Sequence, residues 1–194
     1  MIEELLKEEI DINNKTYTKE NLSNLKIKNK SINNTKYDNS NLTKSELTNI
    51  LFENVTFINC DLSNISFKEC SFKNCSFINC KLLGAYFNNC YFLDMIIDNS
   101  LAKYLNIIES KLKKITIKES ILEESNFYDN EIKTFILDKV NLSKSEIYKT
   151  PLKKVDVSTC NISNIRISPT DIKGLIIDQF QAIDLISILD VTIK

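Results

Sequence analysis

A period of five residues is the dominant feature of this sequence. It is clearest in residues 51–92, which read LFENVTFINCDLSNISFKECSFKNCSFINCKLLGAYFNNCYF and carry an aromatic residue or leucine at every fifth position. An α-helix repeats its apolar face every 3.6 residues and a β-strand every second residue, so neither explains a period of five. A repeat architecture is therefore the first possibility to consider.

The period extends far beyond this stretch. All 34 residues at positions 12, 17, 22 and so on to 177 are apolar. Apolar residues make up 43% of the chain, so chance would produce such a run about once in 10¹² sequences. A second period, of 20 residues, groups the repeats in fours and is visible in two columns: Leu22, Leu42, Leu62 and Leu82, and Tyr17, Tyr37, Phe57 and Phe77.

Two further columns favour close packing and sharp turns. Positions ending in 0 or 5 hold Cys, Ser, Thr or Ala at 17 of the 35 places from 10 to 180. Positions ending in 4 or 9 are dominated by Asn in the first half of the chain, and Asn tolerates unusual backbone dihedral angles. These asparagines are Asn14, Asn24, Asn29, Asn34, Asn39, Asn49, Asn54, Asn59, Asn64, Asn74, Asn79, Asn89 and Asn99.

The columns resemble the pentapeptide-repeat family, whose consensus is A(D/N)LXX. Its central position corresponds to the apolar column and its small position to the column two residues earlier, with local matches at Asn41-Leu42, Asp61-Leu62, Asn141-Leu142 and Asn161-Ile162. The resemblance implies an all-β fold, a right-handed quadrilateral β-helix solenoid with four pentapeptides in each 20-residue coil. Residues 11–178 would form about 8.5 coils, roughly 40 Å long at the usual strand spacing.

Short caps are expected at both ends, because an open coil exposes unpaired backbone edges. Residues 1–10 read MIEELLKEEI and are typical of a short amphipathic N-terminal cap. Residues 179–194 are expected to form a helix, with Asp178 as its N-cap, followed by a short strand at 191–193.

The composition argues against an enzyme and against a cofactor or metal site. The 194 residues include no His and only two Gly, so the chain offers no imidazole base and no glycine-rich phosphate loop. All six cysteines lie in the small column. Packed, reduced thiols are the better interpretation, although Cys60/Cys80 and Cys70/Cys90 are each one coil apart, a spacing that a disulfide could span.

Charge and hydropathy limit the kinds of partner that the sequence predicts. With 25 basic and 26 acidic residues, bulk charge predicts neither a direct nucleic-acid contact nor a membrane partner. No apolar run approaches the roughly 18 residues of a membrane span, and no secretory signal is recognisable. We expect a cytoplasmic protein that binds another protein.

Two sets of outward residues are candidate partner-binding sites. The first is an apolar belt, for which mutual packing on flat solenoid faces is an equally good interpretation: Leu83, Tyr86, Tyr91, Leu93, Ile96, Leu101 and Tyr104. The second is acidic and could orient a partner electrostatically or simply maintain solubility: Glu109, Glu119, Glu123, Glu124 and Asp129. A basic corner in the C-terminal half carries the opposite charge: Lys113, Lys114, Lys133, Lys153, Lys154 and Lys173.

The C-terminal segment GLIIDQFQAIDLISILDVTIK resembles the terminal segment of the Qnr/MfpA branch of the family. That branch binds DNA gyrase, is associated with fluoroquinolone resistance, is dimeric through this end and is described as mimicking duplex DNA. The resemblance implies DNA gyrase or topoisomerase IV as the partner and a homodimer interface formed by Phe180, Ile183, Ile186 and Leu189. Because the net charge is only −1, duplex mimicry would have to come from acids on one face. A structural or scaffolding protein that binds a different protein is the alternative.

Overall fold

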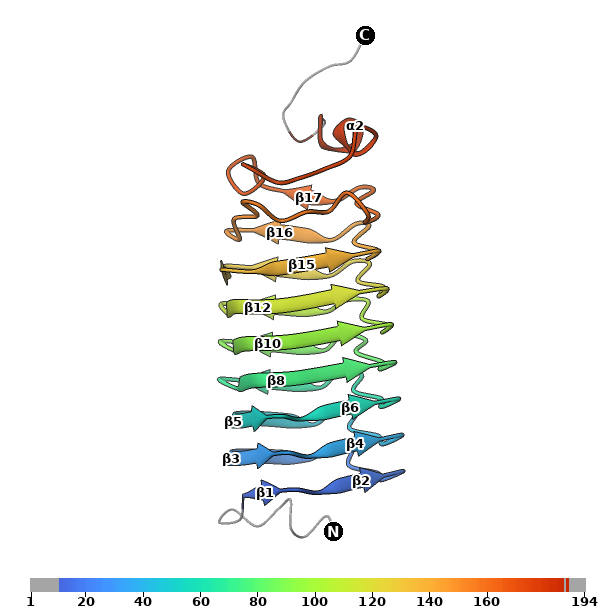
Figure 1. The fold of residues 1–194 in the computed structure, drawn as a ribbon, viewed down its shortest axis with the longest axis vertical. Helices are drawn as coiled ribbons and strands as arrows, with labels where there is room; N and C mark the ends of the chain where they lie inside the picture. The colour runs from blue at the N-terminus through green and yellow to red at the C-terminus, as the bar shows by residue number, and fades with distance from the viewer. Residues whose placement is uncertain (1–10, 187, 189–194) are drawn as a thin grey trace.

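The chain folds as a right-handed quadrilateral β-helix, which confirms the fold class predicted from the repeats (Figure 1). The computed structural model describes residues 11–186 and 188. Successive coils stack along the long axis of the molecule, with β1 at one end and the helix α2 at the other (Figure 1). The expected cap at residues 1–10 and the expected strand at 191–193 lie outside the described residues.

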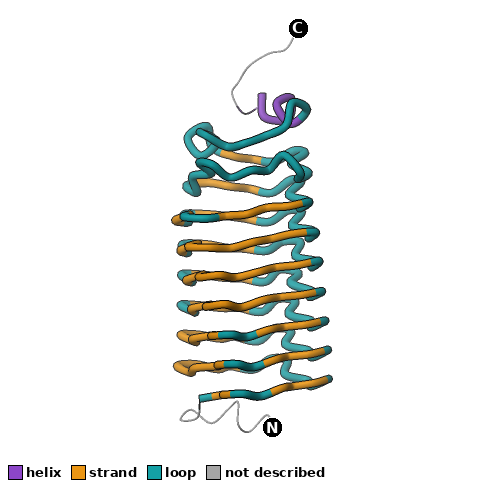
Figure 2. Tube along the Cα trace, in the orientation of Figure 1, coloured by secondary structure: helices purple, strands orange, loops and turns teal. Residues whose placement is uncertain are grey.

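Seventeen strands form one sheet that winds around the solenoid, and its strand pairs are parallel. Paired residues lie 20 positions apart, as Phe72 does from Phe52 and Phe92, except that Leu93 pairs with Lys114. Figure 2 shows strand segments stacked on strand segments and turns stacked on turns. The strands are β1 (Ile12–Asn13), β2 (Thr16–Thr18), β3 (Lys26–Asn33), β4 (Lys36–Asp38), β5 (Glu46–Glu53), β6 (Thr56–Ile58), β7 (Ser66–Lys68), β8 (Ser71–Ile78), β9 (Tyr86–Asn88), β10 (Tyr91–Asp98), β11 (Asn106–Ile108), β12 (Lys111–Lys118), β13 (Asn126–Tyr128), β14 (Glu131–Ile132), β15 (Phe135–Asp138), β16 (Glu146–Tyr148) and β17 (Arg166–Ile167).

The corners of the coils are made by residues in the left-handed backbone conformation. Positive φ values, from 44° to 79°, occur in the described chain only at positions ending in 4 or 9. All of the asparagines identified in this column have such a φ. Asn is enriched in this region because its short polar side chain can bond to nearby backbone, which explains its dominance in the column.

The apolar column forms a continuous core along the axis. Equivalent phenylalanines of successive coils form offset stacks of nearly parallel rings, with ring centroids 4.8 Å apart for both Phe52–Phe72 and Phe57–Phe77. Phenylalanines on neighbouring sides of the coil meet edge to face, as Phe52 and Phe67 do at 5.8 Å and 82°. Both geometries are favourable for aromatic pairs, so the aromatic ladder fills the axis.

The small column completes the hydrogen bonding of the corners. The Oγ of Ser100 accepts a bond from the backbone N–H of Cys80, one coil earlier, at 3.0 Å. The same hydroxyl donates to the carbonyl of Asp98 at 2.8 Å, and Ser120 does the same for Ser100. Buried backbone groups need such partners, so hydroxyls belong in this column for their bonding as well as their size.

One stretch of the frame loses its regular turn. Lys114 and Thr134 lack the left-handed φ of their column, and β10 pairs with β12 through a register shift in which Leu93 aligns with Lys114. Ile132 is only half buried, unlike the other central residues around it. A β-branched residue such as Thr is disfavoured at positive φ, and the coil below must follow because the coils stack in register.

The C-terminal helix α2 (Gln181–Ile186) begins at a capping box. As predicted, Asp178 is the N-cap: its Oδ1 accepts bonds from the backbone N–H groups of Phe180 and Gln181 at 2.7 and 2.9 Å. The Oε1 of Gln181 accepts a bond from the backbone N–H of Asp178 at 3.0 Å. Its Nε2 also donates to the carbonyls of Val157 and Cys160, both at 2.7 Å, and these bonds attach the helix to the solenoid.

The asparagine corners give a first prediction. Asn54 has φ 54° and bonds to Asn34 and Asn74 at 3.0 and 2.6 Å. Asn54→Ala removes both bonds and places an unsuited residue at positive φ, so we expect urea unfolding to show a loss of about 1–2 kcal/mol. Asn54→Gly keeps the backbone conformation accessible and should cost less. Equal losses for the two variants would assign the effect to the amide ladder alone.

Candidate protein-binding face

The apolar belt runs around the solenoid and does not form one patch. Tyr91, Leu93 and Ile96 lie on β10, which turns a corner at Asp94, where φ is 63°. Leu101 lies on another side, in a row of isolated bridges that joins successive coils, and Leu83 and Tyr104 flank the same row. Tyr86 lies on β9. A flat partner surface could contact only part of this belt.

One side of the solenoid gathers aromatic residues in register. It is formed by β9, β11, β13, β16 and β17, and we call it the tyrosine face. Its first outward row runs Tyr86, Asn106, Asn126, Glu146 and Arg166, and its second runs Asn88, Ile108, Tyr128 and Tyr148. Tyr148 is 36% exposed, and the Nζ of Lys149 lies 5.0 Å from the ring centroid of Tyr128. The result is an aromatic surface edged by charge.

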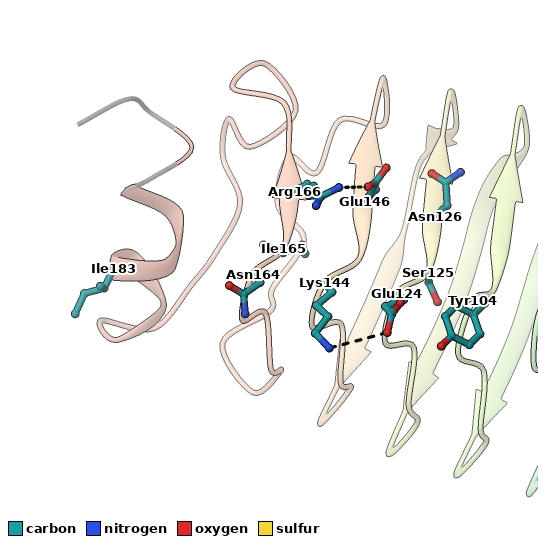
Figure 3. A pocket seen from close by; sticks show the side chains of 10 residues that line it. All are labelled: Tyr104, Glu124, Ser125, Asn126, Lys144, Glu146, Asn164, Ile165, Arg166 and Ile183. Atoms are coloured by element: carbon teal, nitrogen blue, oxygen red, sulfur yellow. Dashed lines mark hydrogen bonds and ion pairs between the residues drawn. The ribbon is translucent and has the colours of Figure 1, made fainter. Parts of the chain in front are cut away.

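A groove of about 790 Å³ runs along one edge of the tyrosine face (Figure 3). Tyr104, 49% exposed, stands at one end of the groove, and Ile183, 63% exposed, stands at the other on α2. The charged groups between them are paired: Arg166 bonds to Glu146 at 2.6 Å, and Lys144 lies 4.0 Å from Glu124. The groove is therefore an open, polar channel with an apolar side chain at each end.

The acidic candidates divide into paired and unpaired groups. Glu119 lies 3.5 Å from Lys139, and Glu123 lies 2.8 Å from Lys103 and 3.1 Å from Lys144. Glu109 and Asp129 have no ion pair within the described part of the chain, and both lie at the other edge of the tyrosine face, next to Ile108 and Tyr128. Hydrogen bonds from Lys103 and Lys144 lower the pKa of Glu123. Much of the acidic charge is thus compensated locally.

The predicted dimer residues fall on different sides of the C-terminal cap. Phe180 is 72% exposed and Ile183 also faces outward, whereas Ile186 is half buried. Leu185, 4% exposed, provides the apolar contact with the core. Leu189 lies outside the described residues.

The cysteines pack as small core residues. All six are free and buried, and burial raises the pKa of Cys75 to about 11, which makes the reactive thiolate rare at neutral pH.

Among the described residues, no group of three or more His, Cys, Asp or Glu side chains is placed to hold a metal ion. No helix in the same part of the chain is long and apolar enough to cross a membrane.

Tyr128 and Tyr148 are the face residues that the sequence interpretation missed. The belt was found from local apolar content, which is highest near residues 83–104. Sorting outward positions by the period of 20 places Ile108, Tyr128 and Tyr148 in one column. That column was the available signal.

Comparison with known proteins places the repeat in a family. Residues 50–127 match the family described as pentapeptide repeat region. These residues therefore carry a pentapeptide repeat. The same five-residue frame continues on both sides of the matched residues, from position 12 to position 177. No curated protein matches the sequence.

Similar solved structures include three other proteins. QnrB1, a plasmid-mediated fluoroquinolone resistance protein, is 17% identical with a TM-score of 0.41, over 95% of this chain and 99% of that one. HetL, a pentapeptide-repeat protein involved in heterocyst differentiation regulation in the cyanobacterium Nostoc, is 10% identical with a TM-score of 0.36, over 85% and 86%. Rfr23 from the cyanobacterium Cyanothece is 15% identical with a TM-score of 0.24, over 86% and 88%.

The ion pairs around Glu123 give the second prediction. Lys103→Gln removes the hydrogen bond that most lowers the pKa of Glu123, so an NMR titration of the side-chain carboxyls should show that pKa rise towards its ordinary value. Because the pKa of Glu123 is depressed in the folded state, the ion pair stabilises the protein at pH values above the unfolded carboxyl pKa of about 4.3. This contribution is lost as the pH falls through the pKa of Glu123 in the folded protein. Lys139→Gln, which removes a lysine paired with Glu119, is the control. An unshifted Glu123 in the Lys103→Gln variant would contradict the pairing.

Proposed function

We propose that this protein is a non-catalytic binding protein that holds a protein partner on the tyrosine face. The proposed partner is a type II topoisomerase, DNA gyrase or topoisomerase IV, which the protein would protect from fluoroquinolones. The observation that carries the binding role is the row of Ile108, Tyr128 and Tyr148, fixed in register by parallel strand pairing. A scaffolding protein that binds a different protein through the same face is the second candidate.

The tyrosine face has the chemistry of a protein-binding surface. Tyr and Arg are enriched among the residues that dominate binding energy at interfaces, and both are present here. A Tyr side chain supplies a large contact area while few torsions must be fixed. The backbone beneath is already ordered by the coil-to-coil bonds, as between Tyr128 and its neighbours Ile108 and Tyr148, so association orders little more than side chains.

The choice of a topoisomerase rests on the resemblance of residues 174–194 to the Qnr/MfpA branch. QnrB1 is described as a fluoroquinolone resistance protein, and the same role is proposed for this chain. Any contribution from duplex mimicry would fall to Glu109 and Asp129, because Glu119, Glu123 and Glu124 are paired with lysines. We therefore assign the main contact to the aromatic row.

We also propose a homodimer that forms through the C-terminal cap. Phe180 and Ile183 are the most exposed large apolar side chains of the described chain, and Ile176 in the last coil is exposed as well. A second copy of the chain could bury this exposed apolar surface at the end of the solenoid. A two-fold interface would bring each residue against the equivalent surface of its partner.

A supercoiling assay with purified DNA gyrase, with and without ciprofloxacin, tests the partner. We expect micromolar protein to restore supercoiling that the drug inhibits. The variant that combines Tyr128→Ala with Tyr148→Ala should lose this effect, because it removes two adjacent aromatic side chains. Truncation of a central interface residue can cost about 2 kcal/mol or more of binding free energy. Tyr91→Ala, on β10, is the matched control and should act as the unmodified protein does.

Two outcomes would contradict these assignments. If the unmodified protein neither inhibits gyrase nor restores supercoiling, the topoisomerase proposal fails and the scaffolding alternative remains. If the protein is active and Tyr91→Ala reduces activity as much as the double variant does, the tyrosine face is not the contact surface.

Sedimentation velocity tests the dimer. The unmodified chain should sediment as a dimer, and Phe180→Glu combined with Ile183→Glu should be a monomer, because the substitutions place charge in an apolar interface. Ile136→Glu combined with Ile121→Glu changes two exposed apolar residues on other sides and should remain dimeric. A monomeric unmodified protein at tens of micromolar would overturn the proposal.

A further inference from the structure

Most ion pairs of this protein join residues one coil apart. Among the described residues, eight pairs have partners 20 positions apart in the sequence, with distances from 2.6 to 4.0 Å. They are Lys26–Glu46, Lys114–Asp94, Lys118–Asp98, Lys103–Glu123, Lys111–Glu131, Lys139–Glu119, Lys144–Glu124 and Arg166–Glu146. This pattern follows from the register, because a side chain's neighbours above and below are the residues 20 positions away. Opposite charges at these positions stabilise the stack, and like charges destabilise it.

One row in the C-terminal half departs from this pattern. Lys133, Lys153 and Lys173 occupy the same position of three successive coils, and Lys154 follows at the corner. All four are exposed, and none has an ion pair with a described residue. The next coil packs closely here, since a Cβ placed on Gly174 would lie 3.2 Å from the Cγ of Lys153. We call these four residues the lysine ladder.

No acid in the described part of the chain forms an ion pair with the lysine ladder, and the acids nearest in sequence have other partners or are buried. Glu131 is held by Lys113 at 3.0 Å and by Lys111 at 3.9 Å. Asp156 accepts bonds from the backbone N–H and the hydroxyl of Ser158 at 2.9 and 2.6 Å. Asp178 caps α2, and Asp171 is buried. Within the described residues, the ladder therefore keeps one sign of charge at one position of successive coils without an ion pair, an arrangement that stacking in register disfavours.

We propose that the lysine ladder is a second interaction surface, which binds a short acidic segment of a protein partner. Its positive charge is confined to three successive coils of a chain whose net charge is −1. A short segment can lie on such a patch, whereas a nucleic-acid duplex would extend over the acidic remainder of the molecule. The row itself contains no aromatic residue on which a base could stack.

The spacing of the ladder suits an acidic helix. Successive coils repeat at about 4.8 Å, and the stacked rings of Phe52 and Phe72 show this step as 4.8 Å. On an α-helix, residues i, i+3 and i+7 lie on one face and are separated by about 4.5 and 6 Å along the axis. Three glutamates at these positions would each face one of Lys133, Lys153 and Lys173. The flexible lysine stems can take up the remaining difference in spacing.

The test uses a fluorescein-labelled helical peptide with glutamates at i, i+3 and i+7, and fluorescence anisotropy at about 25 mM ionic strength, where screening is weak. The same peptide with Gln in place of each Glu is the probe control. Lys133→Gln, Lys153→Gln and Lys173→Gln combined should weaken binding of the acidic peptide about 10-fold or more. Lys26→Gln, Lys118→Gln and Lys139→Gln combined change the net charge equally, remove paired lysines, and should weaken it less than about 3-fold.

The thermal midpoint separates this proposal from a structural role. The ladder variant should melt at or above the temperature of the unmodified protein, because like charges in register are relieved. Equal loss of peptide binding in the two triple variants, or a lower midpoint in the ladder variant, would overturn the proposal. Tighter binding of a 20-base-pair duplex than of the peptide would also overturn it, in favour of nucleic acid. The supercoiling assay depends on the tyrosine face, so the two proposals can fail separately.

Discussion

Every other property of this molecule depends on the stacking of each residue on its equivalent 20 positions away. The parallel register fixes that neighbour, as it does for Phe52, Phe72 and Phe92. A coil alone could not bury its inward side chains or pair its backbone groups. The central column must therefore be apolar without interruption, and at all 34 positions it is.

The same constraint decides which polar groups suit the surface. Side chains that bond to copies of themselves form ladders, such as the amides of Asn34, Asn54 and Asn74. Charged side chains cannot do so, and they are satisfied by alternation of sign from one coil to the next. A row of like charges in a solenoid therefore indicates a role other than stability, because the neighbours of each residue are fixed by the register. On an irregular globular surface, oppositely charged neighbours from any direction could compensate a similar cluster.

The sequence was sufficient for the architecture because the period of five is enforced at every central position and the left-handed corners select Asn. It also located the helix N-cap, since Asp178 precedes a short apolar helix. It could not show that α2 turns Leu185 towards the core and Ile183 outward, because bonds from Gln181 to the carbonyls of Val157 and Cys160 set that orientation. Nor could it show the irregular turn that Lys114 shares with Thr134, because this change passes between coils through stacking in register.

The candidate site was only partly accessible from the sequence for a related reason. Local composition identifies residues that are close along the chain, but the outward neighbours in a solenoid are 20 residues apart. Tyr86, Glu109 and Asp129 were correctly marked as outward, yet their common location on one side follows only when positions are compared between coils. The same comparison adds Tyr128 and Tyr148.

A convex rod must also solve a problem of register when it binds a partner. The backbone repeats every coil, so a partner that read only the backbone could bind equally well after sliding by about 4.8 Å. The outward rows remove this ambiguity because they do not repeat: the second row of the tyrosine face reads Asn88, Ile108, Tyr128 and Tyr148. If the partner slid by one coil, the part of its surface that fits Tyr128 would lie against Ile108. The partner's polar group that bonds to the Tyr128 hydroxyl would then lose its hydrogen bond, which is costly at an interface. Specific recognition by such a scaffold therefore resides in the order of residues along a row, and the inward columns can remain uniform.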